Sequence, residues 1–212
     1  MSIPRVKICG ITRVQDAATA AQAGADAIGM VFYAASARYL NDLLLARDIA
    51  QAVGPFVCVT ALFVDAVQSE VEKVLAKVPV NLLQFHGNEN SHYCASFDFP
   101  YLKALRVKDK ISLERELALF PGASGILLDT YVKGKPGGTG ESFNWELVPQ
   151  HKPQAIIVAG GLTPNNVAAA LQQTRAYGVD VSGGVESAPG IKSPELIRRF
   201  ISNAKSVEDK LK

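Results

Sequence analysis

Two residues that can exchange protons end apolar runs that lie far apart in the chain. Cys9 ends the run VKIC, and Asp129 ends the run ILLD. A thiol, whose ordinary pKa is about 8.5, can act as a base when nearby N–H groups or cations favour the thiolate. A carboxyl group that is desolvated among apolar side chains can stay partly protonated and act as a general acid. The structural alternatives are a small buried cysteine and an aspartate that caps its loop.

Paired glycines follow the last two apolar runs of the chain. Gly160 and Gly161 come after the first of these runs, and Ser182, Gly183 and Gly184 come after the second. Without a Cβ, the backbone of such a turn can approach an anion and offer its N–H groups. Each pair alone could simply make a tight turn, but two pairs after consecutive runs favour a phosphate site.

Two further polar side chains follow apolar runs and have competing interpretations. Arg38 could recognise a carboxylate through its guanidinium fork, or it could be a solvated surface charge. His86 could contact a ligand, or it could be a buried and fully hydrogen-bonded histidine. Cys58 lies within an apolar run and Cys94 within a helical pattern, so both are expected to be structural.

The elements that must position these residues alternate between short apolar, β-branched runs and amphipathic helical segments. Nearly continuous apolar runs are typical of parallel strands covered on both faces. Right-handed crossovers leave an open doubly wound sheet or a closed barrel, and eight units in 212 residues favour a single (β/α)8 TIM barrel spanning residues 1–212. Thr163 is expected to cap the helix that begins at Pro164. The expected strands are Val6–Cys9, Ala27–Phe32, Val57–Phe63, Val80–Phe85, Tyr101–Val107, Gly125–Leu128, Ala155–Ala159 and Gly178–Val181.

The barrel prediction determines where the site should be, because active sites of this fold lie at the carboxyl ends of the strands. The candidate site residues considered above all stand at such ends or follow them. A long glycine-rich loop, Gly137-Gly138-Thr139-Gly140, also follows Asp129, yet it matches neither the P-loop pattern nor the dinucleotide-binding pattern.

Composition points to a small ligand. The net charge is +2 without a basic stripe, which argues against nucleic acid as a partner. The first residues carry no apolar targeting segment, and no apolar run approaches the ~20 residues of a membrane span, so a cytoplasmic location is expected. Three cysteines without C-x-x-C spacing and three scattered histidines indicate neither a disulfide framework nor a metal site.

Six motifs in register over essentially the whole chain resemble the phosphoribosylanthranilate isomerase family. They are VKICGIT, VFYAASARYL, LLQFHG, LLDT with GGTG, VAGGLTPNNV and DVSGGVESAPGIK. The resemblance implies an Amadori rearrangement of N-(5-phosphoribosyl)anthranilate to 1-(2-carboxyphenylamino)-1-deoxyribulose 5-phosphate in tryptophan biosynthesis, without cofactor or metal.

The same resemblance implies roles for individual residues. Asp129 corresponds to the general acid that opens the ribose ring, and Cys9 to the general base that removes the C2′ proton. Arg38 corresponds to the arginine that binds the anthranilate carboxylate. His86 is expected among the substrate contacts, and the loop after Asp129 is expected to cover the site. The phosphate-binding turns are implied to contain Gly160, Gly161, Ser182, Gly183 and Gly184.

The chain departs from the family pattern in three places. Alanines at 34, 35 and 37 stand where members often have prolines, Gly183 stands where a serine is common, and Ser193 stands where an aspartate is common. Ser193 can still cap the last helix. The alternatives are another phosphosugar barrel enzyme, or a barrel that binds a phosphorylated ligand for regulation without catalysis. A monomer or a homodimer is expected.

Overall fold

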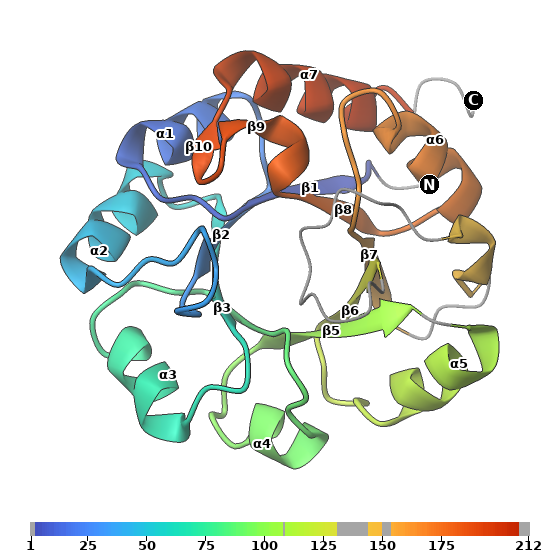
Figure 1. The fold of residues 1–212 in the computed structure, drawn as a ribbon, viewed down its shortest axis with the longest axis horizontal. Helices are drawn as coiled ribbons and strands as arrows, with labels where there is room; N and C mark the ends of the chain where they lie inside the picture. The colour runs from blue at the N-terminus through green and yellow to red at the C-terminus, as the bar shows by residue number, and fades with distance from the viewer. Residues whose placement is uncertain (1–2, 108, 131–143, 150–153, 208–212) are drawn as a thin grey trace.

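Eight parallel strands close into a barrel with helices around its outside (Figure 1). The computed structural model describes residues 3–107, 109–130, 144–149 and 154–207. Strands β1 to β8 pair in chain order, and β8 pairs with β1 to close the ring, which confirms the predicted TIM barrel over the open sheet. The strands are Arg5–Cys9 (β1), Ala27–Val31 (β2), Cys58–Phe63 (β3), Leu82–Phe85 (β4), Tyr101–Val107 (β5), Gly125–Thr130 (β6), Ala155–Val158 (β7) and Gly178–Val181 (β8).

The helices connect successive strands and cover the outer face of the barrel. None of the described helices is both long and apolar enough to cross a membrane. The helices are Val14–Gln22 (α1), Leu43–Ala52 (α2), Gln68–Leu75 (α3), Ser91–Ala95 (α4), Lys110–Ala118 (α5), Val167–Thr174 (α6) and Pro194–Lys205 (α7). Two short 3₁₀ turns, Trp145–Leu147 (η1) and Gly183–Val185 (η2), and a small antiparallel pair, Glu186–Ala188 (β9) with Ile191–Lys192 (β10), complete the described elements.

Helix α7 shows how the sequence sets these boundaries. The Ser193 hydroxyl accepts a hydrogen bond from the N–H of Leu196, and Pro194 occupies the first turn, where its missing N–H costs nothing. The buried side chains recur at helical spacing, so one stripe faces the barrel. The expected cap at Ser193 is therefore confirmed. These buried residues are Ile197, Phe200, Ile201 and Ala204.

The Thr163 hydroxyl makes a cap-type hydrogen bond, accepting from the N–H of Asn165 at 3.3 Å, but the predicted helix start at Pro164 is wrong. Helix α6 begins at Val167, with Asn166 as its N-cap residue. The Asn166 side chain turns back and its Oδ1 accepts from the N–H of Thr163, while its Nδ2 donates to the carbonyl of Gly161. Pro164 therefore lies in a turn that precedes the helix.

Side chains along each strand alternate between the helix layer and the barrel interior. On β1, Val6 and Ile8 join the core between the strands and the helices, whereas Cys9 packs against Val31 and Leu62 inside the barrel. The interior is thus a packed core that leads up to the site.

Strand β6 runs two residues beyond its predicted end. The ladder with β5 continues through the pairs Arg106↔Asp129 and Val107↔Thr130. Asp129 is consequently held within the sheet, so the backbone from which its carboxyl group projects is fixed. The other predicted strands differ from the observed ones by up to two residues at an end.

Candidate active site

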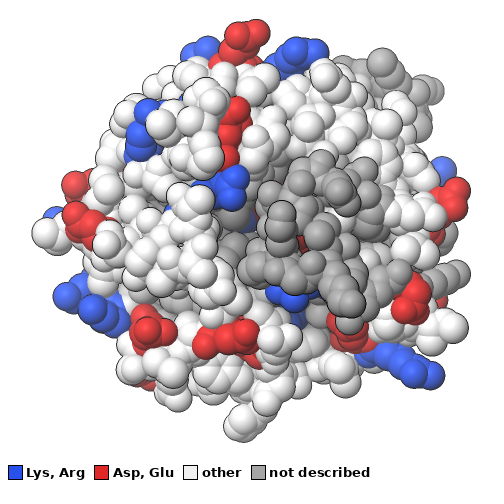
Figure 2. Space-filling model, viewed as in Figure 1, with Lys and Arg blue, Asp and Glu red and all other residues white. Residues whose placement is uncertain are grey.

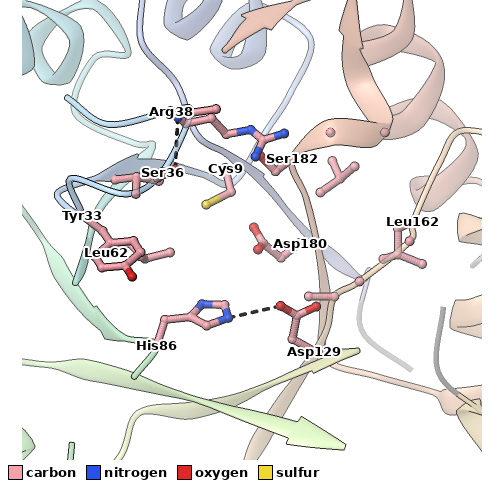
Figure 3. Close-up of a pocket in the computed structure, with 18 of the residues that line it drawn as sticks. Cys9, Tyr33, Ser36, Arg38, Leu62, His86, Asp129, Leu162, Asp180 and Ser182 are labelled. Atoms are coloured by element: carbon pink, nitrogen blue, oxygen red, sulfur yellow. Dashed lines mark hydrogen bonds and ion pairs between the residues drawn. The ribbon is translucent and has the colours of Figure 1, made fainter. Parts of the chain in front are cut away.

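One cavity of about 580 Å³ opens at the carboxyl ends of the strands, and every predicted site residue lines it. Cys9 lies across the cavity from Asp129, and Asp180 lies between them (Figure 3). Side chains of both charges are interspersed around this face of the molecule (Figure 2). The predicted residues that meet in the cavity are Cys9, Arg38, His86, Asp129, Gly160, Gly161, Ser182, Gly183 and Gly184.

The Cys9 thiol is 5% exposed at the end of β1. Burial raises its pKa, the nearby Lys7 ammonium lowers it, and the Asp180 carboxylate raises it again. Gly29, paired with Cys9 on β2, leaves room for the sulfur, because a Cβ there would lie 2.8 Å from Sγ. A thiol in this environment reaches its basic form only with the help of nearby cations.

The Asp129 carboxyl group is held on both oxygens. The backbone N–H of Thr130 donates to Oδ1 at 2.8 Å, and His86 Nε2 lies 3.2 Å from Oδ2. On the far side of the ring, Gln84 Nε2 lies 3.0 Å from His86 Nδ1. The ring thus bridges Gln84 and Asp129, with donor and acceptor roles that depend on its tautomer. His86 therefore orients the carboxyl group.

Gly160 lies against Asp129 from the turn that follows the neighbouring strand, β7. Its φ of +81° is in the left-handed region, and a Cβ there would overlap Thr130 Oγ1 and lie 2.7 Å from Asp129 Oδ1. The glycine is thus required by its backbone conformation and by the close approach of the carboxyl group.

A Gly160→Ala variant is expected to lose about tenfold in kcat, because the added methyl group displaces Asp129. Gly54→Ala is the matched control: Gly54 has a φ of +75°, but a Cβ there meets nothing within 4 Å. Gly54→Ala should lose about 1 kcal/mol of stability from backbone strain alone, and Gly160→Ala should lose more, because its Cβ also overlaps Thr130; thermal unfolding measures both. Equal kcat values in the two variants would show that the contact with Asp129 does not matter.

Arg38 is oriented by a bidentate ion pair with Glu186. Its Nε and Nη2 donate to the two carboxylate oxygens, each at 2.7 Å, and hydrogen bonding to Glu186 raises the arginine pKa. Lys192, 1% exposed, also donates to Glu186, at 2.8 Å. Within the described residues two cations share this carboxylate, which leaves the cluster with one positive charge. Such a cluster suits an anionic ligand.

The glycine turns after β7 and β8 pack directly against each other. Gly161 has a φ of +61°, and a Cβ on Gly184 would overlap the carbonyl oxygen of Leu162. The first N–H groups of the η2 turn have no partner within that turn. Lys192 Nζ lies 3.1 Å from the carbonyl oxygen of Ser182, beneath the second turn. Backbone donors and a buried cation together can hold a phosphate group.

Two further points concern the glycine-rich loop and metal binding. The glycine-rich loop with Gly137, Gly138, Thr139 and Gly140 lies outside the described residues. Among the described residues no group of three or more histidine, cysteine, aspartate or glutamate side chains could hold a metal ion.

Five residues of the site were missed by sequence reasoning. Lys7 stands two residues before Cys9 on β1, and Gln84 on β4 stands two residues before His86, which directly follows that strand, so the alternation of strand side chains could have placed both inside the barrel. Glu186 and Lys192 lie in quoted motifs, but their contacts with Arg38 and Ser182 depend on tertiary structure. The five are Lys7, Gln84, Asp180, Glu186 and Lys192.

Comparisons with known proteins agree with this geometry. A family model described as N-(5'phosphoribosyl)anthranilate (PRA) isomerase matches residues 6–203. An N-(5'-phosphoribosyl)anthranilate isomerase from Cellvibrio japonicus is 55% identical over 199 residues, covering 94% of this chain and 92% of the relative. The crystal structure of phosphoribosyl anthranilate isomerase from Thermotoga maritima superposes with a TM-score of 0.87 at 37% identity, covering 96% of this chain and 99% of that one.

A second solved structure carries a bound ligand. It is a phosphoribosyl anthranilate isomerase in complex with reduced 1-(o-carboxyphenylamino)-1-deoxyribulose 5-phosphate, with a TM-score of 0.84 and 36% identity over 96% of this chain and 99% of that chain. The fold, the residues that meet in the cavity and the extent of these matches lead to one assignment. This chain belongs to the N-(5'-phosphoribosyl)anthranilate isomerase family.

Proposed function

We propose that this chain is an isomerase of tryptophan biosynthesis that converts N-(5-phosphoribosyl)anthranilate into 1-(2-carboxyphenylamino)-1-deoxyribulose 5-phosphate. The observation that carries the proposal is that a thiol and a carboxyl group face each other across a cavity that two glycine turns also line. Family membership supports the substrate and the reaction. The whole chain, residues 1–212, is proposed to form one catalytic domain.

The first step uses Asp129 as general acid. Its carboxyl proton goes to the ring oxygen of the ribose while the C1′–O bond breaks, and the nitrogen lone pair forms a C1′=N iminium bond. His86 and the N–H of Thr130 fix the carboxyl group during this transfer. Fixed orientation of the proton donor lowers the entropic part of the barrier.

The second step uses the Cys9 thiolate as general base. It removes the proton on C2′, and the electron pair of that bond forms a C1′=C2′ double bond while the iminium nitrogen becomes neutral. The resulting enolamine then tautomerises to the ketone. The iminium makes C2′ acidic, so a modest base suffices. These steps move protons and electron pairs that the substrate and the two side chains supply, so they need neither a redox cofactor nor a metal.

The two ends of the substrate are proposed to bind at different places in the cavity. The phosphate fits the turns at Gly160-Gly161 and Ser182-Gly183-Gly184, where backbone N–H groups and Lys192 converge. The anthranilate carboxylate fits Arg38, whose guanidinium keeps further N–H donors beyond the two that hold Glu186. The ribose would then lie between Cys9 and Asp129.

Replacement of Arg38 by alanine should raise KM about tenfold or more, because a charge-assisted contact with the substrate carboxylate is lost. The kcat should change less than KM. Arg5→Ala is the matched control, since Arg5 pairs with Asp26 at the opposite end of β1. Steady-state kinetics of both variants test this assignment. An unchanged KM in Arg38→Ala would mean that the substrate carboxylate binds elsewhere.

A barrel that binds a phosphorylated ligand without turnover is the alternative from another functional class. Incubation of the protein with phosphoribosylanthranilate, followed by the fluorescence of the anthranilate group, separates the two. Catalysis predicts a signal change at a rate proportional to protein concentration, whereas a binding protein gives a single stoichiometric change. We further propose a cytoplasmic location. We also propose a monomeric or homodimeric state, and sedimentation measurements can decide between these two states.

A further inference from the structure

We propose that Lys7, itself held by Asp180, is a positioning residue that keeps a positive charge against the Cys9 sulfur and so prepares it to act as the base. This inference rests on the role proposed above for Cys9. Lys7 acts through that sulfur and has no assigned contact with substrate.

The geometry of β1 places the lysine and the cysteine together. Lys7 and Cys9 are two residues apart on one strand, so their side chains project to the same side, into the barrel. A Cβ on Gly29 would lie 2.8 Å from Cys9 Sγ and 3.0 Å from Lys7 Nζ. The sulfur and the ammonium group therefore flank the same point on β2.

Asp180 fixes the ammonium group from the other neighbouring strand. Asp180 is the register partner of Lys7 on β8, and its Oδ1 accepts from Lys7 Nζ at 2.8 Å. The two side chains are 7% and 9% exposed. Burial alone lowers the pKa of Lys7, but the charges of Asp180 and Cys9 outweigh it, so the pKa is raised and the lysine stays charged.

The charges around Cys9 come from four elements. Lys7 on β1, Lys192 on β10 and Arg38 in the loop after β2 are cationic, and Asp180 on β8 is anionic. After burial, the Lys7 charge has the largest effect on the thiol pKa and lowers it, whereas the smaller effect of Asp180 raises it. Removing the lysine charge should therefore shift the thiol titration to higher pH.

A further buried lysine pair, away from Cys9, shows a different arrangement. Lys103 donates to Glu89 at 2.9 Å and also to the carbonyl oxygens of Phe85 and Gly87, so it fastens the chain that follows β4. It also lowers the pKa of a different thiol, Cys94, which burial raises to about 11. Lys103 thus provides a matched control for the loss of a buried, paired lysine.

The test measures the pH dependence of Cys9 alkylation by iodoacetamide, resolved by peptide mass spectrometry so that Cys58 and Cys94 are counted separately. Lys7→Gln should slow Cys9 modification at pH 7 by about tenfold, as a rise of one unit in the thiol pKa would. Lys7→Arg should restore most of the rate, and Lys103→Met should leave the Cys9 rate unchanged. The acid limb of the kcat profile should move to higher pH in parallel.

A double variant guards against loss of folding. Lys7→Gln with Asp180→Asn removes both charges and leaves no buried ion unpaired. Because the effect of Lys7 on the thiol exceeds that of Asp180, the Cys9 rate should still fall, by about threefold. Unchanged alkylation profiles in the single variant, or in the double variant if the single one does not fold, would overturn the proposal. A shifted alkylation profile with an unshifted kcat profile would instead contradict the role of Cys9 as base while leaving the effect of Lys7 on the thiol intact.

Discussion

A Cys9→Ala variant is expected to lose at least about 10²-fold in kcat while it still binds substrate, because general base catalysis is removed and the binding contacts remain. The thiol is the one basic group that β1 directs into the cavity next to Lys7 and Asp180 in the described part of the chain. The measurement is steady-state turnover of phosphoribosylanthranilate, together with binding of a non-reactive product analogue.

Cys58→Ala is the control for this variant. Cys58 begins β3 at the opposite end of the strand from the cavity and is half-buried. Its replacement should leave kcat unchanged. Turnover of Cys9→Ala at the wild-type rate would rule out the thiol as the base, whatever the behaviour of the control.

Replacement of Asp129 by asparagine should also lower kcat by at least about 10²-fold, because an amide cannot donate the proton that opens the ribose ring. The change keeps the shape of the side chain and an acceptor for the N–H of Thr130, so the fold should be retained. Single-turnover rates separate this loss from any change in product release.

Asp48→Asn is the control for the carboxyl replacement. Asp48 is exposed on α2, away from the cavity, and its loss should change neither kcat nor thermal stability appreciably. A kcat within twofold of wild type in Asp129→Asn would mean that another group protonates the ring oxygen.

The barrel and the predicted site residues could be derived from sequence because the fold brings the carboxyl ends of all eight strands to one rim. Cys9 and Asp129 are 120 positions apart in the chain, yet both stand at the ends of apolar runs, and any closed parallel barrel places such ends together. The paired glycines after β7 and β8 could be assigned to the same rim for the same reason. Side-chain roles needed the family resemblance in addition.

The charged interior of the barrel could not be derived in the same way. Lys7 and Asp180 interrupt apolar runs, and their burial becomes favourable only when the ring closes and pairs β1 with β8. The Gln84–His86–Asp129 chain of contacts likewise spans β4 and β6, which are not neighbours in the ring. Such contacts depend on strand order and register, which local patterns do not specify.

The helix after Thr163 begins later than predicted for a local reason. Threonine followed by proline is a common helix start, but here the Asn166 side chain hydrogen-bonds to backbone groups on both sides of the turn and delays the helix to Val167.

The claim that Cys9 and Asp129 act from opposite sides of one ribose is tested most directly by turnover of phosphoribosylanthranilate in the two single variants and in Cys9→Ala/Asp129→Asn, followed by the fluorescence of the anthranilate group. The account predicts a rapid signal change with the native protein and losses of at least about 10²-fold in both single variants. It also predicts that the double variant is little slower than the slower single variant, because the two groups act on one substrate in sequence. A double variant that turns over substrate at the native rate would contradict it.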